Sequence, residues 1–262
     1  MVAIHPLAGI WGPGADHDFE VFFGQGSATI GPPIFMHRAS SPGPTVPRKH
    51  HKGENPHETF PVFGTSFRSG TTWIEVSAFS ARELTPEDSR FHPYVAAPVS
   101  GAARVRHVFG DWLELQVSGE HLHDQGNGES DTSQLSASAY AWGEVKHFGL
   151  DGLLDYALDA PDEGDASQAV LAEFALRSPS RREIAWLRTE LNQREEPASR
   201  GGVGGSAAGG TPQTSGTVSG PWFFQTVGYE HVLFVTSGLQ VGVFGELTAI
   251  ALPSSLKSFY GQ

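Results

Sequence analysis

The chain has 262 residues, and its 29 Asp and Glu residues outnumber its 17 Lys and Arg residues, for a formal net charge of −12. This charge argues against a general nucleic-acid binder, which needs a basic face to displace counterions from phosphates. Cysteine is absent, which excludes disulfides, thiolate zinc sites, iron–sulfur clusters and cysteine nucleophiles.

The N-terminal residues 1–20 lack the basic segment, the apolar core and the cleavage site of a signal peptide. The chain also has no run of about 18 apolar residues, which excludes a transmembrane helix. Both features are typical of a soluble protein. They do not exclude a membrane β-barrel, whose strands alternate, or a chain whose export signal lies upstream.

Apolar residues recur with a period of two along most of the chain, which is typical of strands with one apolar and one polar face. The pattern is clearest in 112–118, 134–142 and 239–249. In chain order it predicts strands over 18–25, 59–67, 71–79, 98–109, 112–118, 134–142, 147–158, 168–177, 182–191, 222–235 and 239–249. Roughly ten strands at hairpin spacing predict an all-β antiparallel meander or barrel.

Two segments interrupt this pattern. Residues 31–57 are rich in Pro and His and predict a long ordered loop, and residues 196–221 are rich in Gly and Ser. The second segment is either a flexible loop or a linker between two domains. We favour the loop because strand-like alternation resumes on both sides, so residues 1–262 are predicted to form a single β-barrel-like domain.

The stretch 168–194 contains good helix formers and is compatible with either a helix or a β-hairpin. The sequence Ser-Pro-Ser at 178–180 interrupts any helix there. Phe174 and Leu176 keep a period of two before the interruption, and Ile184 and Trp186 keep it afterwards. The pattern therefore favours the hairpin.

Alternation alone does not say where the apolar faces point. A soluble sandwich buries them in a core, whereas a membrane barrel turns them toward lipid. The apolar positions are rich in small residues, and five tryptophans fall within or at the ends of predicted strands: Trp73, Trp112, Trp142, Trp186 and Trp222. Aromatic residues at strand ends are typical of outer-membrane barrels and also of ordinary sheets.

Residues 30–92 contain the phrases IGPPIFMHRAS, HHKGENPHETFPVFGTSF and WIEVSAFSARELTPEDSRF. They resemble a family of bacterial outer-membrane β-barrel proteins of unassigned function. That family has a Gly-Pro turn before FMHRPS-like residues, a His pair with a third His six positions after the second, and a phrase like FNGREPDE. The equivalent residues here are Gly31, Pro32, Phe35, Met36, His37, Arg38, His50, His51, His57, Phe79, Arg82 and Glu83. Looser similarity continues through 115–124, 132–142 and the C-terminal PSSLKSFYGQ.

The chain departs from the family pattern in several places. Lys52 replaces a tryptophan, and Leu-Thr-Pro separates Glu83 from Glu87. Family members begin upstream with an export signal and usually continue into one further strand. These differences predict a truncated or divergent member, with the export signal outside this chain.

The resemblance implies a transmembrane β-barrel, complete or incomplete, in the bacterial outer membrane. It implies a porin-like or structural envelope role linked to small-solute or metal-ion handling. The expected partners are outer-membrane lipid or lipopolysaccharide and small solutes or ions. The alternative is a soluble β-sandwich or jelly-roll binding domain with a His-based metal site.

The histidines of the first loop are the strongest candidates for metal ligands. His37, His50, His51 and His57 lie close together in the sequence, and imidazole is a common ligand for zinc and copper. The sequence thus offers a Zn or Cu site. The pattern favours the alternative, a polar loop whose histidines bond to carboxylates and backbone, and it is also compatible with proton-linked gating.

A second group of charged residues follows the third predicted strand. Arg82, Glu83, Glu87 and Arg90 are predicted to line a constriction of the barrel lumen through ion pairs, or else to lie in an exposed turn. The sequence contains no GxSxG, HExxH or Walker motif, so no catalytic residue is assigned and the chain is predicted not to be an enzyme.

Overall fold

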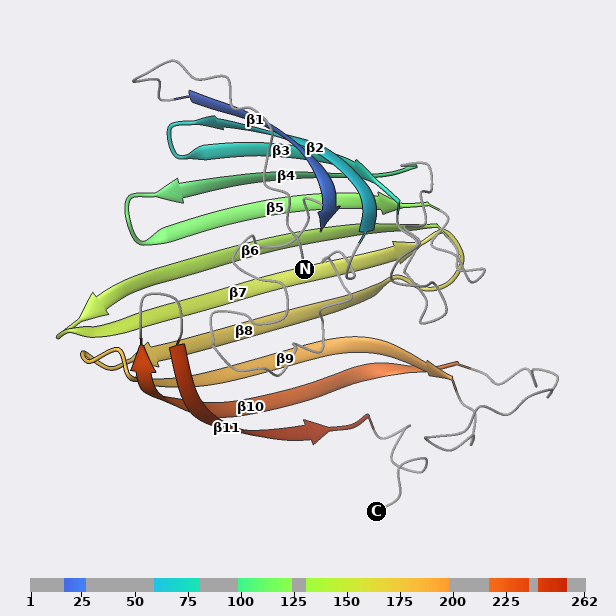
Figure 1. The fold of residues 1–262 in the computed structure, drawn as a ribbon. Coiled ribbons are helices and arrows are strands. Elements are labelled where there is room, and N and C mark those ends of the chain that lie inside the picture. Colours follow the sequence, from blue (N-terminus) through green and yellow to red (C-terminus); the bar gives the residue numbers. More distant parts are fainter. Residues whose placement is uncertain are drawn as a thin grey trace.

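The computed structural model describes residues 17–26, 59–80, 99–123, 131–197, 217–235 and 240–253. These residues form one antiparallel sheet of eleven strands, in which each strand pairs with its neighbours in sequence (Figure 1). The strands are β1 (His17–Gly26), β2 (Thr59–Ser69), β3 (Thr72–Phe79), β4 (Ser100–Phe109), β5 (Leu113–Leu122), β6 (Thr132–Val145), β7 (Phe148–Pro161), β8 (Ser167–Arg177), β9 (Glu183–Pro197), β10 (Thr217–Val235) and β11 (Gln240–Ala251).

All eleven predicted segments coincide with strands, and the predicted antiparallel meander is confirmed. The hairpin over 168–194 is also confirmed, because β8 pairs with β9 through Phe174 and Leu187. The helical alternative was wrong there, since pairing on both sides of each strand outweighs local helix propensity. The predicted loop 31–57 lies outside the described residues.

The predicted flexible loop 196–221 was too long at both ends. Glu196 and Pro197 still belong to β9, and β10 begins at Thr217. The two strands pair there through Thr217 and Pro197. Continued pairing extends both strands into sequence whose glycines and prolines favour a turn.

The connections at the two ends of the sheet differ in length. At the left end in Figure 1, the described turns are short: 70–71, 110–112, 146–147 and 178–182. At the opposite ends of the strands, β1 connects to β2 through 27–58, β3 to β4 through 80–99, β5 to β6 through 123–131, β7 to β8 through 162–166 and β9 to β10 through 198–216. Lys146 and His147 both have positive φ, as in the two-residue hairpin turns whose twist matches that of the flanking strands.

The sheet is curved but does not close into a barrel. In the view of Figure 1, the edge strands β1 and β11 curl forward across the front of the central strands. Among the described residues, β1 pairs only with β2 and β11 pairs only with β10. The closed transmembrane barrel expected from the sequence is therefore not reached in the described sheet, because its two edges do not pair.

The buried face of the sheet carries many polar residues, and the exposed face carries most of the large apolar residues. In β5 the alternate residues Glu114, Gln116, Ser118 and Glu120 are buried, whereas Leu115 and Val117 are exposed. Other buried polar residues are Glu75, Ser77, Gln134, Ser136, Ser138, Asp151, Asp155, Glu173, Arg188, Glu190, Asn192 and Thr226. This is the reverse of the usual soluble sheet, which buries its apolar face.

Small apolar groups interrupt the polar face. Val62, Phe79, Ala102 and Leu122 form the largest of these groups, with Phe22 packed against it. The ring of Phe22 covers Gly64 on the neighbouring strand, and a Cβ at Gly64 would lie 2.0 Å from Phe22 Cζ. Glycine is therefore required there by the close approach of an aromatic ring.

A second aromatic ring covers a glycine between β9 and β11. Trp186 of β9 extends across Gly228 of β10, and its indole N–H donates to Glu246 Oε1 of β11 at 3.1 Å. A Cβ at Gly228 would lie 2.1 Å from Trp186 Cε2. Because Gly228 has no side chain, Trp186 of β9 can cross β10 and reach Glu246 of β11.

Replacing Gly228 with Ala is expected to displace Trp186 and to lower the free energy of unfolding by about 1–3 kcal/mol, as other overpacking changes do. The near-ultraviolet circular dichroism of the tryptophans should change with it. Gly143→Ala is the matched control, because nothing lies within 4 Å of a Cβ at that position. Equal stability of the two variants would contradict the expected clash.

Candidate functional site

The candidate functional site is the buried polar face of the sheet. Its buried charged side chains in the described part of the chain are seven carboxylates and one guanidinium: Glu75, Glu114, Glu120, Asp151, Asp155, Glu173, Glu190 and Arg188. Three partly buried arginines add to them: Arg104, Arg106 and Arg177. Acidic groups therefore exceed basic groups on this face, which gives it a negative potential.

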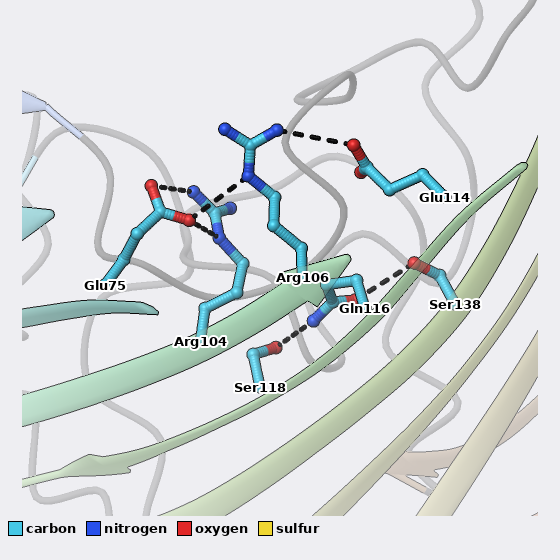
Figure 2. Close-up of polar contacts among 7 residues, drawn as sticks. All are labelled: Glu75, Arg104, Arg106, Glu114, Gln116, Ser118 and Ser138. Carbon is cyan, nitrogen blue, oxygen red and sulfur yellow. Dashed lines mark hydrogen bonds and ion pairs between the residues drawn. The ribbon is translucent and has the colours of Figure 1, made fainter. Parts of the chain in front are cut away.

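Two arginines of β4 connect acidic residues of β3 and β5 (Figure 2). Arg104 donates to both carboxylate oxygens of Glu75, from Nε at 2.7 Å and from Nη2 at 3.0 Å. Arg106 forms an ion pair with Glu75 at 3.5 Å and donates to Glu114 Oε2 at 3.3 Å. The bidentate contact fixes the orientation of both partners, so these four side chains form an ordered charged network.

Trp73 of β3 lies between two arginines in one cross-strand row. Arg68 of β2 and Arg106 of β4 are its direct partners in the sheet. Their guanidinium carbons lie 5.3 Å and 4.1 Å from the centre of the indole ring. These cation–π contacts extend the charged network to β2.

A row of uncharged polar groups continues from β5 to β7. Gln116 donates to Ser118 Oγ at 2.7 Å and accepts from Ser138 Oγ at 3.0 Å (Figure 2). On the next strand, Ser136 donates to Asp155 Oδ1 at 3.2 Å. The polar face is thus hydrogen-bonded across its centre, as a buried polar surface requires.

A second set of ion pairs lies on β7, β8 and β9. Arg188 Nε lies 2.7 Å from Glu173 Oε2, and both side chains are fully buried. Asp151 accepts from Arg177 Nη2 at 2.9 Å and from the hydroxyl of Tyr140 at 2.8 Å. This set connects the acidic residues of β7 and β8 to arginines on β8 and β9.

A cavity of about 310 Å³ lies at the end of the sheet with short turns. Residues that line it include Trp142, His147, Arg177 and Arg181, and they come from the β6–β7 and β8–β9 hairpins. Arg181 lies 3.6 Å from Glu144, which also lines the cavity. The rim of the polar face is thus more basic at this end than its centre.

The opposite face of the sheet carries one unbroken row of apolar residues, which we call the apolar belt. Each member is the cross-strand partner of the next, and together they span all eleven strands. All are exposed except Val170, which is half-buried. The belt consists of Phe19, Phe67, Ile74, Val105, Val117, Ala137, Tyr156, Val170, Leu191, Phe223 and Ala251.

The site residues predicted from the sequence fall outside the described residues. This is so for the metal ligands His37, His50, His51 and His57, and for the constriction residues Arg82, Glu83, Glu87 and Arg90. Both groups therefore stay predictions. In the described ranges, no three His, Cys, Asp or Glu side chains lie close enough together to hold a metal ion.

Sequence reasoning missed the ion pairs of the polar face. The alternation of polar and apolar residues in the sequence did place Glu114 and Gln116 together on one face of a strand. The missing signal was charge complementarity between neighbouring segments, such as Glu75 on one strand and Arg104 on the next. Two buried opposite charges at paired positions would have indicated a polar interior.

Comparison of the chain with protein-family models, curated proteins and solved structures found no match. The family resemblance in residues 30–92 therefore stays a prediction. None of the described residues forms a helix that is long and apolar enough to cross a membrane.

Proposed function

We propose that the chain forms the greater part of an outer-membrane β-barrel whose polar face encloses a path or binding surface for small solutes or ions. The observation that carries this proposal is the apolar belt. Soluble monomers rarely expose a contiguous apolar surface larger than a few hundred Å². In a lipid bilayer, by contrast, contact between such a belt and the acyl chains is favourable.

Two further features support the proposal. Outer-membrane barrels combine short turns at one end with longer loops at the other, and the three longest connections of this sheet all lie at one end of its strands. A membrane-crossing strand needs about 9–11 residues, and the strands from β4 onward have between 10 and 19. The net negative charge of the polar face favours cations over anions in its interior.

The proposal is tested by refolding the chain into detergent and then into phospholipid vesicles. We expect folded protein in both, with faster migration of the unheated sample on SDS gels than of the heated one. Vesicles with brominated acyl chains should quench the tryptophan emission, since the exposed Trp112 lies at the end of the sheet. The proposal would be contradicted if the protein were folded and monodisperse in plain buffer and did not bind vesicles. That result would favour the soluble binding domain.

Conductance across a planar bilayer then separates the two envelope roles. A porin-like role predicts ion-conducting events, with a reversal potential in a KCl gradient that indicates cation preference. A structural role predicts insertion without conductance.

A further inference from the structure

Glu120 differs from the other buried acids of the polar face. The side chain is 6% exposed, and neither carboxylate oxygen has a hydrogen-bond partner in the structure. By contrast, Glu75, Glu114, Asp151 and Glu173 each contact an arginine. A buried carboxylate without a partner costs free energy, so its presence needs an explanation.

The position of Glu120 in the sheet places two other oxygen donors beside it. Glu120 of β5 pairs with Gln134 of β6, and Gln134 pairs with Asp159 of β7. The three residues therefore form one row on the same face. Neighbouring strands are about 4.8 Å apart, so the Cα atoms of Glu120 and Asp159 are roughly 10 Å apart with Gln134 between them. Side chains of this length can converge on one ion above Gln134.

On β4, the residue paired with Glu120 has an apolar side chain. That residue is Ala102, which is buried and belongs to an apolar group with Leu122. Burial and, after it, the negative charge of Asp159 raise the pKa of the Glu120 carboxyl to about 8. A cation between the two carboxylates would remove their repulsion and also supply the missing partner of Glu120.

We propose that Glu120, Gln134 and Asp159 form a Ca²⁺-binding site on the polar face. Two carboxylates and an amide carbonyl are hard oxygen ligands, which suit Ca²⁺. The row has no imidazole and the chain has no thiolate, so zinc and copper are disfavoured. Flexible side chains from three strands suit the irregular coordination of Ca²⁺ better than the strict octahedron of Mg²⁺. Water molecules would complete the coordination shell.

The site is tested by calorimetric titration of CaCl₂ into the full chain folded in detergent. We expect saturable binding with a Kd on the order of 10⁻⁴–10⁻³ M, as in weak Ca²⁺ modules with few charged ligands. MgCl₂ should bind more weakly. Glu120→Gln and Asp159→Asn should each weaken Ca²⁺ binding at least about tenfold, since each removes one of two anionic ligands.

Glu163→Gln is the control, because Glu163 is an exposed acid in the β7–β8 connection. This variant should bind Ca²⁺ as the parent does. Should Glu120→Gln fail to fold, Asp159→Asn gives the same reading. The proposal is overturned if the parent shows no saturable Ca²⁺ binding, or if the folded Glu120 and Asp159 variants bind as tightly as the parent. The titration measures binding without conductance, so failure of the pore and failure of the site are distinguishable.

Discussion

Replacing Val117 with Arg is expected to destabilise the protein by about 2–4 kcal/mol in phospholipid vesicles, as for a cation placed at the middle of a bilayer. Val117 is a member of the apolar belt at the centre of β5, and it is 61% exposed. A residue this exposed in a soluble protein would accept arginine with a change within about 0.5 kcal/mol. The same substitution is thus expected to destabilise a protein in a bilayer strongly and a soluble protein hardly at all. Urea unfolding followed by tryptophan fluorescence measures the difference.

His121→Arg is the matched control for Val117→Arg. His121 lies on the same strand and also points to the exposed face, but it is next to the end of β5. The cost of arginine near the bilayer surface falls to about 0–1 kcal/mol. Equal and small effects at both positions would contradict a membrane location for the belt. A large effect at Val117 alone would support the proposed barrel.

Replacing Arg188 with Met is expected to lower the free energy of unfolding by about 3–5 kcal/mol, because it leaves the buried Glu173 carboxylate without its cation. Both side chains are fully buried, and the two atoms that pair lie 2.7 Å apart. The double variant Arg188→Met with Glu173→Leu should recover most of this loss, since well-packed apolar residues often replace a buried pair without cost.

Arg181→Met is the control for the Arg188 substitution. Arg181 pairs with Glu144 at 3.6 Å, but its side chain is 79% exposed. An exposed ion pair contributes about 0–1 kcal/mol, so this variant should unfold almost as the parent does. Similar losses for Arg188→Met and Arg181→Met would mean that Arg188 lies in water-filled space. That result would change the interpretation of the polar face from a packed interior to an open one.

The sequence was sufficient to locate the strands, because alternation is a local property. Leu113, Leu115 and Val117 alternate with Glu114 and Gln116, and this pattern predicted a strand over 112–118 where β5 extends from Leu113 to Leu122. The beginning of β10 was harder to predict. Gly220 and Pro221 favour a turn, but pairing with β9 keeps them in the ladder. Strand ends thus depend on a neighbour that the local sequence does not reveal.

The direction of each face was not predictable from the sequence. A period of two is the same whether Val117 meets lipid or a core. The contact of Glu75 with Arg104 joins residues 29 positions apart, and it follows only from the register of β3 and β4. The site residues predicted from the sequence lie outside the described residues. The polar face emerged only when the strands were paired.

The two edges of the sheet have a geometric consequence. In an antiparallel meander, all odd-numbered strands run in one direction, so β1 and β11 are parallel to each other. Joining them directly would create one parallel ladder, whose hydrogen bonds are slanted and evenly spaced. Keeping every ladder antiparallel would instead take an odd number of additional strands at the seam. The parity of the strand count therefore determines how this sheet can form a cylinder.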